Sequence, residues 1–340
     1  MVIIIFFNFM NIYFLQVFFK LKFYSPVFAD TNPLFVLRSM LGKNLFTMCC
    51  ISRKSKCAEC QFSRTCVYAF LFETILSSDN EALPGRNRAS HPYSFSSSQN
   101  QTDGDLLKDY SFKMTLFGRA IEYLPYIYAA FVRSGQNGLF KSRTPFKIES
   151  VFANGKNILI DENHLDMNFS PSEWNCDFFD FGKDCNTDFI LAEDEEILNR
   201  DRNVGAESAS EILVNLKSPL RFKVEGKYTM DFTAQDFMNC LLRRAKTLCS
   251  LYGDISEEEK SLWSLPCENI SMNERNLRWI DLRHYSARQK TAMDLGGAVG
   301  TFKLRGNFSE TERSLLKLAE AAGAGKNTNF GLGQLECWGK

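Results

Sequence analysis

The hydrophobic pattern in the first half of the chain predicts six elements in a recognisable order. Residues 11–24 include the alternating text VFFKLKF, which is typical of a half-buried strand. Residues 32–48 place leucines at helical spacing behind Asn32 and Pro33, a plausible cap and first-turn pair. The remaining predicted elements are a short strand near Tyr93, a strand at 109–118, a helix at 119–135 and a strand at 146–153. Strand, helix, strand, strand, helix, strand is the order of a ferredoxin-like fold.

The pattern in the last 130 residues predicts the same order a second time. We expect strands within 211–228, a helix at 231–253, strands at 277–289 and 296–308, a helix at 309–323 capped by Ser309, and a closing strand at 334–338. The predicted fold class is therefore α+β, with tandem ferredoxin-like (RRM-like) domains and insertions. The expected boundaries are an N-terminal domain at 10–160, an acidic linker or insertion at 161–210 and a C-terminal domain at 211–340.

Composition and charge are consistent with a folded protein that has two basic flanks. The chain has 340 residues, of which 45% are hydrophobic, enough to bury two cores. Its net charge of zero hides an asymmetry: residues 1–160 carry +8, residues 161–211 carry −12 and residues 212–340 carry +4. This distribution favours a polyanion bound by the flanks, although a solvated acidic loop explains the middle segment equally well.

Two features bear on where the protein resides. The apolar N-terminal run is interrupted by Asn8, Asn11 and Gln16, so we expect a strand there and no membrane partner, with an anchor or signal peptide as the alternative. Either Met1 or Met10 is the start. Eleven unevenly spread cysteines favour a reducing cytoplasm over a disulfide framework.

A Cys-rich knuckle at 49–66 predicts a structural zinc site. Cys57, Cys60 and Cys66, with Cys49 or Cys50 before them, provide four thiolates around a CxxC turn, as tetrahedral zinc requires. An iron–sulfur cluster or plain buried thiols are the alternatives. Four thiolates leave no open coordination position, so we expect no catalytic metal.

The run GAGKNTNFGLG at 323–333 follows the last predicted helix. Four glycines within eleven residues allow backbone N–H groups to approach an anion, and Lys326 adds a charge that seeks phosphate. The spacing of a nucleotide-hydrolase P-loop is absent, because Glu320 and Asn327 occupy its diagnostic positions. A tight glycine-shaped turn is the alternative explanation.

This glycine-rich run resembles the C-terminal loop of the repeat-associated RNA-binding (RAMP) superfamily, and specifically of the CRISPR repeat-RNA-processing endoribonucleases. Stretches at 57–73, 116–126, 218–223 and 283–300 are also similar to that family. The resemblance implies that CRISPR repeat RNA is the partner, together with effector-complex subunits. It also implies an endoribonuclease whose substrate 2′-hydroxyl attacks the adjacent phosphate, leaving a 2′,3′-cyclic phosphate and a 5′-hydroxyl. A non-cleaving RNA-binding subunit is the alternative.

The family's usual histidine near the first helix is missing, because residues 25–48 contain none. The candidate acid–base residues are therefore His91, beside a basic loop, and His284, which shares a predicted strand face with Ser286 and Arg288. Structural roles for both histidines remain open. The predicted RNA contacts are Arg38, Lys43, Arg283, Arg288, Lys290, Gly323, Gly325, Lys326, Asn327, Gly331 and Gly333.

Overall fold

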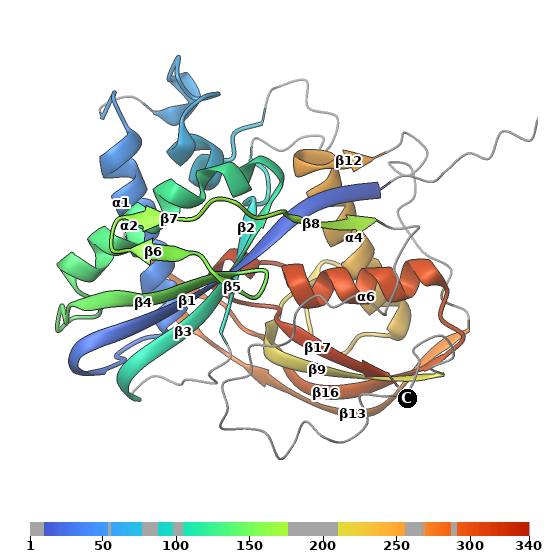
Figure 1. Ribbon diagram of the computed structural model, residues 1–340. Coiled ribbons are helices and arrows are strands. Elements are labelled where there is room, and N and C mark those ends of the chain that lie inside the picture. The colour runs from blue at the N-terminus through green and yellow to red at the C-terminus, as the bar shows by residue number, and fades with distance from the viewer. Residues whose placement is uncertain are drawn as a thin grey trace, which may run out of the picture.

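The protein is built around two main antiparallel sheets, each with two long helices packed on it (Figure 1). The computed structural model describes residues 10–53, 56–76, 88–97, 105–175, 210–255, 267, 269–286 and 291–339. Within these residues, no helix is both long and apolar enough to cross a bilayer.

The first sheet has the strand order β2-β3-β1-β4-β5. Its strands are β1 (Met10–Phe28), β2 (Tyr93–Ser96), β3 (Leu106–Phe117), β4 (Phe146–Ala153) and β5 (Lys156–Asn157). Helices α1 (Pro33–Cys49) and α2 (Leu124–Asn137) bury their apolar faces in the same core as β1 and β3. With the four main strands in the order second, third, first, fourth, this half is ferredoxin-like.

The second sheet repeats that order as β13-β16-β9-β17. Its strands are β9 (Glu211–Leu220), β13 (Ile270–Ile280), β16 (Gly297–Gly306) and β17 (Leu335–Gly339). Helices α4 (Ala234–Tyr252) and α6 (Glu310–Ala322) cover one of its faces (Figure 1). The predicted tandem ferredoxin-like fold is therefore confirmed.

Both halves also contain short helical turns and short strands. The helical turns are η1 (Cys57–Glu59), η2 (Ala69–Glu73), η3 (Gly118–Tyr123) and η5 (Thr328–Phe330). The short strands are β6 (Leu159–Asp161), β7 (His164–Leu165), β8 (Ser172–Asn175), β10 (Lys223–Val224), β11 (Lys227–Tyr228), β12 (Asp254–Ile255), β14 (Arg283–Ser286) and β15 (Thr291–Asp294). The pairs β6–β7, β10–β11 and β14–β15 are antiparallel hairpins.

The predicted helix caps are present, and they explain where the helices begin. The Asn32 side chain accepts a hydrogen bond from the Leu34 N–H at 3.0 Å, with Pro33 in the first turn of α1. Ser309 and Glu312 form a reciprocal capping box at the start of α6. These local contacts satisfy backbone donors that no helical carbonyl can reach.

Three predicted elements differ from the structure. The helix expected from residue 119 begins as a 3-10 turn, and α2 starts at Leu124 because Pro125 is tolerated only in a first turn. The strand expected at 277–289 is broken between β13, which ends at Ile280, and β14, which begins at Arg283. Part of the expected acidic linker forms β7 and β8, while residues 176–209 lie outside the described residues.

Strand β1 runs diagonally across the molecule and joins the two halves (Figure 1). Its first part, with Met10, Ile12 and Phe14, is buried in the core of the second half. From Leu15 onward its buried residues belong to the core of the first half. Strands β12 and β8 both pair with the beginning of β1, so late chain segments complete the first sheet.

This shared strand predicts that the two halves are coupled in stability. Ile12→Ala removes a fully buried side chain from the second core, and we expect the unfolding free energy to fall by about 2–5 kcal/mol. Tyr13→Ala is the matched control, because the neighbouring Tyr13 is 46% exposed and should change stability little. Chemical denaturation of both variants measures the difference, and equal stabilities would contradict this account of β1.

Candidate functional site

The glycine-rich loop at 323–333 connects α6 to β17 and lies at the junction of the two halves. Five of its residues have positive φ: Gly323, Gly325, Asn327, Gly331 and Gly333. A Cβ at Gly333 would stand 1.8 Å from the Ala324 carbonyl oxygen, and one at Gly325 would stand 2.5 Å from the Arg221 carbonyl oxygen. These glycines are needed because the loop packs closely against the protein's own backbone.

Many of the loop's backbone donors are used inside the protein. The Ala324 N–H donates to the Gly333 carbonyl and the Lys326 N–H to the Arg221 carbonyl, each at 2.8 Å. The Gly333 N–H donates to the Pro219 carbonyl at 3.0 Å. These bonds hold the loop in one shape and present its side chains, and a contact of the glycines with an anion stays a prediction.

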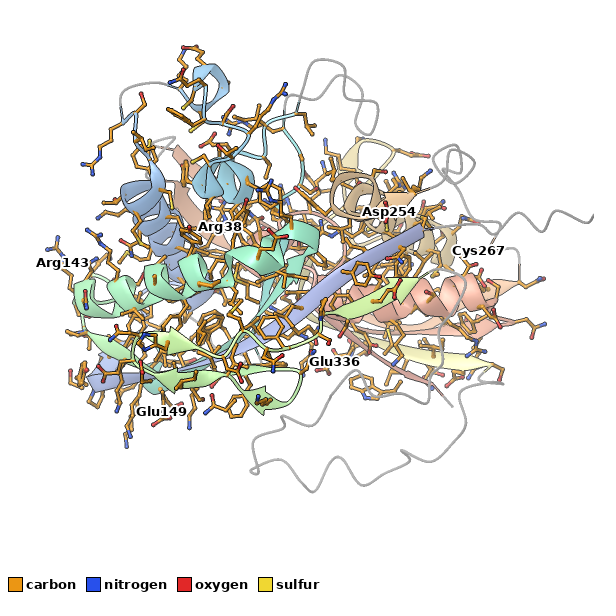
Figure 2. All side chains as sticks on the ribbon, turned by 45° about the horizontal axis from the view of Figure 1, so that its top comes forward. Arg38, Arg143, Glu149, Asp254, Cys267 and Glu336 are labelled. Atoms are coloured by element: carbon orange, nitrogen blue, oxygen red, sulfur yellow. The ribbon has the colours of Figure 1, made fainter. Side chains whose placement is uncertain are left out.

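Helix α1 meets this loop through an aromatic and cationic contact. The Arg38 guanidinium lies 4.0 Å from the centre of the Phe330 ring and 5.5 Å from that of Phe72. Phe35, one turn earlier on α1, packs edge-to-face on Phe330. Arg38 therefore points into the molecule, whereas Arg143 points outward (Figure 2). Such stacking fixes a guanidinium while leaving its N–H groups free to donate.

Arg38, His91 and Asn329 converge at the junction. Arg38 Nη2 lies 3.0 Å from His91 Nε2. With its amide oxygen facing the guanidinium, Asn329 accepts from Arg38 Nε at 2.9 Å, from Arg38 Nη2 at 3.0 Å and from His91 Nε2 at 3.1 Å. The three residues come from α1, the segment before β2 and the glycine-rich loop.

The electrostatics of this centre are strongly positive. Burial, together with the charges of Arg38, Arg244 and Arg88, lowers the pKa of His91 to about 3. The imidazole is therefore neutral at physiological pH. Burial also raises the pKa of the neighbouring Tyr93 hydroxyl to about 12.

Arg244 on α4 supports the loop from the second half. Its Nη2 donates to Thr328 Oγ1 at 2.9 Å, and burial lowers its pKa to about 10. The Arg244 side chain is buried, its Nε has no hydrogen-bond partner, and no carboxylate within the described ranges forms an ion pair with it. An arginine held this way contributes an uncompensated charge to the centre.

The sequence did not predict Asn329, Arg244 or Tyr93 as residues of this site. A signal existed for Arg244, which stands three residues after Leu241 and four before Leu248 on the apolar stripe of α4. A charged residue on the apolar face of a helix is unusual, and this is the signal that could have marked Arg244 as a candidate site residue. Asn329 had no comparable signal, because only the folded loop directs it toward α1.

The other predicted residues are dispersed or lie outside the described residues. Lys43 and Lys326 are exposed, on α1 and in the loop respectively. The backbone of Arg283 and His284 forms β14, but their side chains lie outside the described residues, as do Arg288 and Lys290 entirely. A catalytic role for His284 stays a prediction.

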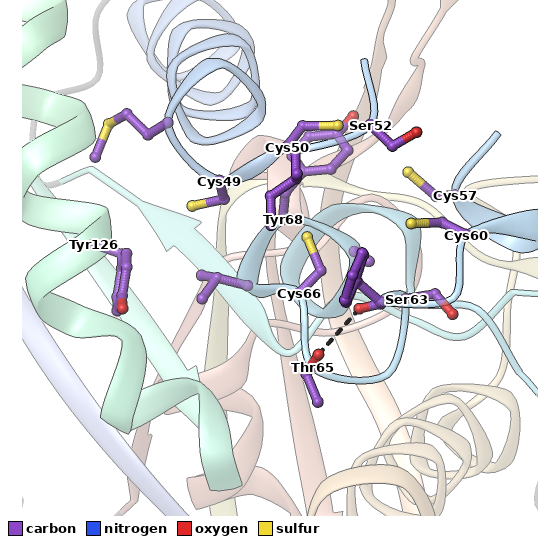
Figure 3. A pocket seen from close by; sticks show the side chains of 15 residues that line it. Cys49, Cys50, Ser52, Cys57, Cys60, Ser63, Thr65, Cys66, Tyr68 and Tyr126 are labelled. Atoms are coloured by element: carbon purple, nitrogen blue, oxygen red, sulfur yellow. Dashed lines mark hydrogen bonds between the residues drawn. The ribbon is translucent and has the colours of Figure 1, made fainter. Parts of the chain in front are cut away.

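The predicted metal ligands Cys49, Cys57, Cys60 and Cys66 line one cavity of about 280 Å³ together with Cys50 (Figure 3). All five side chains are partly exposed. Among the described residues, however, no three potential metal ligands stand close enough together to hold an ion. The five thiols therefore line the same cavity, but they do not form a complete set of metal ligands. Zinc binding stays a prediction.

Comparisons with known proteins agree with this architecture. Residues 214–335 match the family of the CRISPR-associated endoribonuclease Cas6, and residues 12–169 match a family described as AF_1859_N, N-terminal domain. The chain is similar to the Cas6 (TTHB231) product complex, from Thermus thermophilus, at 15% identity and a TM-score of 0.53, covering 97% of this chain and 99% of that one.

A second solved structure, the partial Cas6-RT-Cas1-Cas2 complex, is similar at 14% identity with a TM-score of 0.51. That match covers 97% of this chain and 46% of the other. Among curated proteins, none matches the sequence.

The two ferredoxin-like halves, with the glycine-rich loop packed at their junction, are the fold that this chain shares with these structures. Together with the family match over residues 214–335, this shared fold supports a CRISPR repeat-RNA-processing protein of the Cas6 type.

The burial of His91 predicts a dependence of stability on pH. The unfolded chain binds this proton near pH 6.5 and the folded protein only near pH 3, so acid favours unfolding throughout that interval. As the pH falls from about 6.5 to about 5, we expect His91 to lower the unfolding free energy with a slope that approaches about 1.4 kcal/mol per pH unit. His91→Gln, measured by denaturation across the same interval, should show a flatter profile; identical slopes would contradict a buried neutral imidazole.

Zinc binding predicts about one metal ion per chain, because four thiolates saturate one tetrahedral ion. Metal analysis of protein purified under reducing conditions measures this. Cys57→Ser and Cys66→Ser should each lose the ion, whereas Cys337→Ser, outside the cavity, should retain it. Folded wild-type protein that contains no metal after expression with added zinc would rule the site out.

Proposed function

We propose that the protein cuts CRISPR repeat RNA at the centre formed by Arg38, His91 and Asn329. The observation that carries the proposal is the convergence of these three residues, from both halves of the chain, in a positively charged junction. The substrate's 2′-oxygen attacks the adjacent phosphorus, and the bond to the 5′-oxygen breaks. A proton leaves the 2′-hydroxyl and another reaches the 5′-oxygen, which gives a 2′,3′-cyclic phosphate and a 5′-hydroxyl.

The charge of the centre supports phosphate as the ligand. Of the three arginines that act on His91, only Arg88 forms an ion pair within the described part of the chain, with buried Glu73 at 3.0 Å. Arg38 and Arg244 have no carboxylate partner there. A phosphodiester would neutralise this excess charge, and a fixed guanidinium stabilises the extra negative charge of the transition state.

His91 fits a positioning role toward Arg38 in the free protein, because its Nε2 lies 3.0 Å from the guanidinium and 3.1 Å from the Asn329 amide oxygen. When Arg38 turns to a phosphate, Nε2 becomes available as an acceptor for the 2′-hydroxyl proton. The phosphate's negative charge would also raise the low pKa of His91 toward a useful range. His284 remains the alternative proton carrier.

The names of the similar structures support the proposed partners. The first is a Cas6 product complex, and the second is a partial Cas6-RT-Cas1-Cas2 complex. By analogy, we propose repeat RNA as the ligand of this chain and other CRISPR proteins as its assembly partners. The proposed compartment is the cytoplasm. Zinc, where bound, would brace the knuckle and take no part in the reaction.

Single-turnover cleavage of a repeat transcript tests the proposal. Arg38→Ala should slow cleavage by about a hundredfold or more, because it removes a cation positioned at the transition state. Arg143→Ala is the matched control, since this exposed arginine points away from the junction. A substrate with a 2′-deoxy sugar at the cut should not react, and added chelator should not change the rate.

Two further variants separate the roles of His91. If it only positions Arg38, His91→Gln keeps an acceptor and should cleave far better than His91→Ala. If it carries a proton, both variants should be equally slow, and if His284 carries it, His284→Ala should be the slowest. Cleavage of the deoxy substrate at the wild-type rate would overturn the mechanism. Tight binding without any cleavage would identify the protein as a non-cleaving RNA-binding subunit.

A further inference from the structure

A second cationic cluster lies beside the glycine-rich loop, on the β10–β11 hairpin. Three cations surround the ring of Tyr228: Arg221 at 3.7 Å, Lys223 at 5.1 Å and Lys326 at 5.8 Å from its centre. Two come from the segment that follows β9, and the third comes from the loop. We call these four residues the Tyr228 cluster.

The backbone holds the Tyr228 cluster in place without RNA. Lys223 and Tyr228 are directly opposite each other in the hairpin. Arg221 Nη1 donates to the Gly296 carbonyl at 2.8 Å, and the Arg221 carbonyl accepts from the Lys326 N–H, also at 2.8 Å. The close approach at Gly325 is therefore what brings Lys326 beside Arg221. The cations are preorganised, which lowers the entropy lost on binding an anion.

The cations of the Tyr228 cluster differ from Lys217 and Lys303 in having no ion pair within the described residues. On the outer sheet, Lys217 pairs with Glu336 at 3.3 Å and Lys303 with Glu211 at 3.1 Å. Within the described residues, no carboxylate pairs with Arg221, Lys223 or Lys326. Glu225 is present in the turn of the same hairpin, but it forms no ion pair with them.

We propose that the Tyr228 cluster is a phosphate-binding subsite for the RNA strand, separate from the cutting centre. Three like charges gathered on one ring repel one another, and a phosphate between them removes that repulsion. The Tyr228 ring holds the guanidinium by cation–π stacking and gives it a defined direction. This inference rests on the proposed function, because it assigns a further contact for the same RNA.

The position of the Tyr228 cluster allows one strand to reach both sites. Lys326 belongs to the cluster and Asn329 to the cutting centre, and they are only three residues apart in the same loop. Three peptide units span at most about 11 Å. The loop thus aligns the two sites, so that a strand cut at Arg38 continues over Tyr228.

The salt dependence of binding tests the subsite independently of cleavage. The probe is a repeat RNA with a 2′-deoxy sugar at the cut, so that it binds without reacting, and its affinity is measured over a range of salt concentrations. Each phosphate contact that is lost should lower the slope of log affinity against log salt by about 0.7 for a single strand. We expect this change for Lys223→Ala and for Lys326→Ala, and about twice the change for the double variant.

Matched variants distinguish a subsite from general loss of charge. Lys217→Ala also removes one positive charge, but Lys217 is ion-paired, so its slope should match the wild type. Lys326→Arg keeps the charge and should restore the slope. Tyr228→Ala should weaken binding by releasing the Arg221 guanidinium, while Tyr228→Phe retains the ring and should bind like the wild type.

The outcomes separate this inference from the proposed function. Tight binding with the wild-type slope in the Lys223→Ala, Lys326→Ala double variant would overturn the subsite, whatever the cleavage result. Reduced slopes in a protein that never cuts RNA would support the subsite while contradicting the cutting centre. Failure of the wild type to bind the RNA at all would overturn both.

Discussion

The sharing of β1 between two hydrophobic cores is the constraint on which the rest of the structure depends. Met10, Ile12 and Phe14 are buried with the second half, and the rest of the strand is buried with the first. A rotation of one half against the other would expose one end of this strand to water, at a cost proportional to the apolar area uncovered. The junction between the halves is therefore rigid enough to hold a site.

Trp174 strengthens that junction. It pairs with Ile12 across β8 and β1, and its indole N–H donates to the Ser314 carbonyl on α6 at 2.9 Å. Thr115 on β3 likewise donates to the Ala321 carbonyl at 2.7 Å. Each contact links the first sheet to the last helix, so the end of α6, where the glycine-rich loop begins, has a fixed place relative to α1.

The loop then divides its contacts between two sites. Gly325 allows the loop to lie on the Arg221 carbonyl, which places Lys326 at the β10–β11 hairpin. A few residues later, Phe330 packs on Arg38 and Asn329 turns to its guanidinium. The glycines thus act through the protein's own packing, and the side chains between them make the contacts available to a ligand.

The sequence by itself determined the order of elements and much of the fold. Alternation in β1 and β4, helical spacing in α1, and the caps at Asn32 and Ser309 are local properties, because the period of the side chains and the backbone donors of a helix end depend on near neighbours. Two repeats of one element order then predicted the tandem architecture, which the structure confirms.

Only the tertiary structure decided which of the candidate residues form a site. Arg38 and His91 were each visible as candidates, but they are 53 residues apart, and no local pattern brings them to 3.0 Å. Asn329 lies in the glycine-rich loop and Tyr228 lies in the hairpin beside it. Both acquire their roles because this loop folds back onto the Arg221 carbonyl, which is distant in sequence. The sequence also indicated the thiols of the knuckle, whereas the distances between them depend on the packing around the cavity. Long-range contacts of this kind follow from the burial of both cores together, and not from the propensity of any one segment.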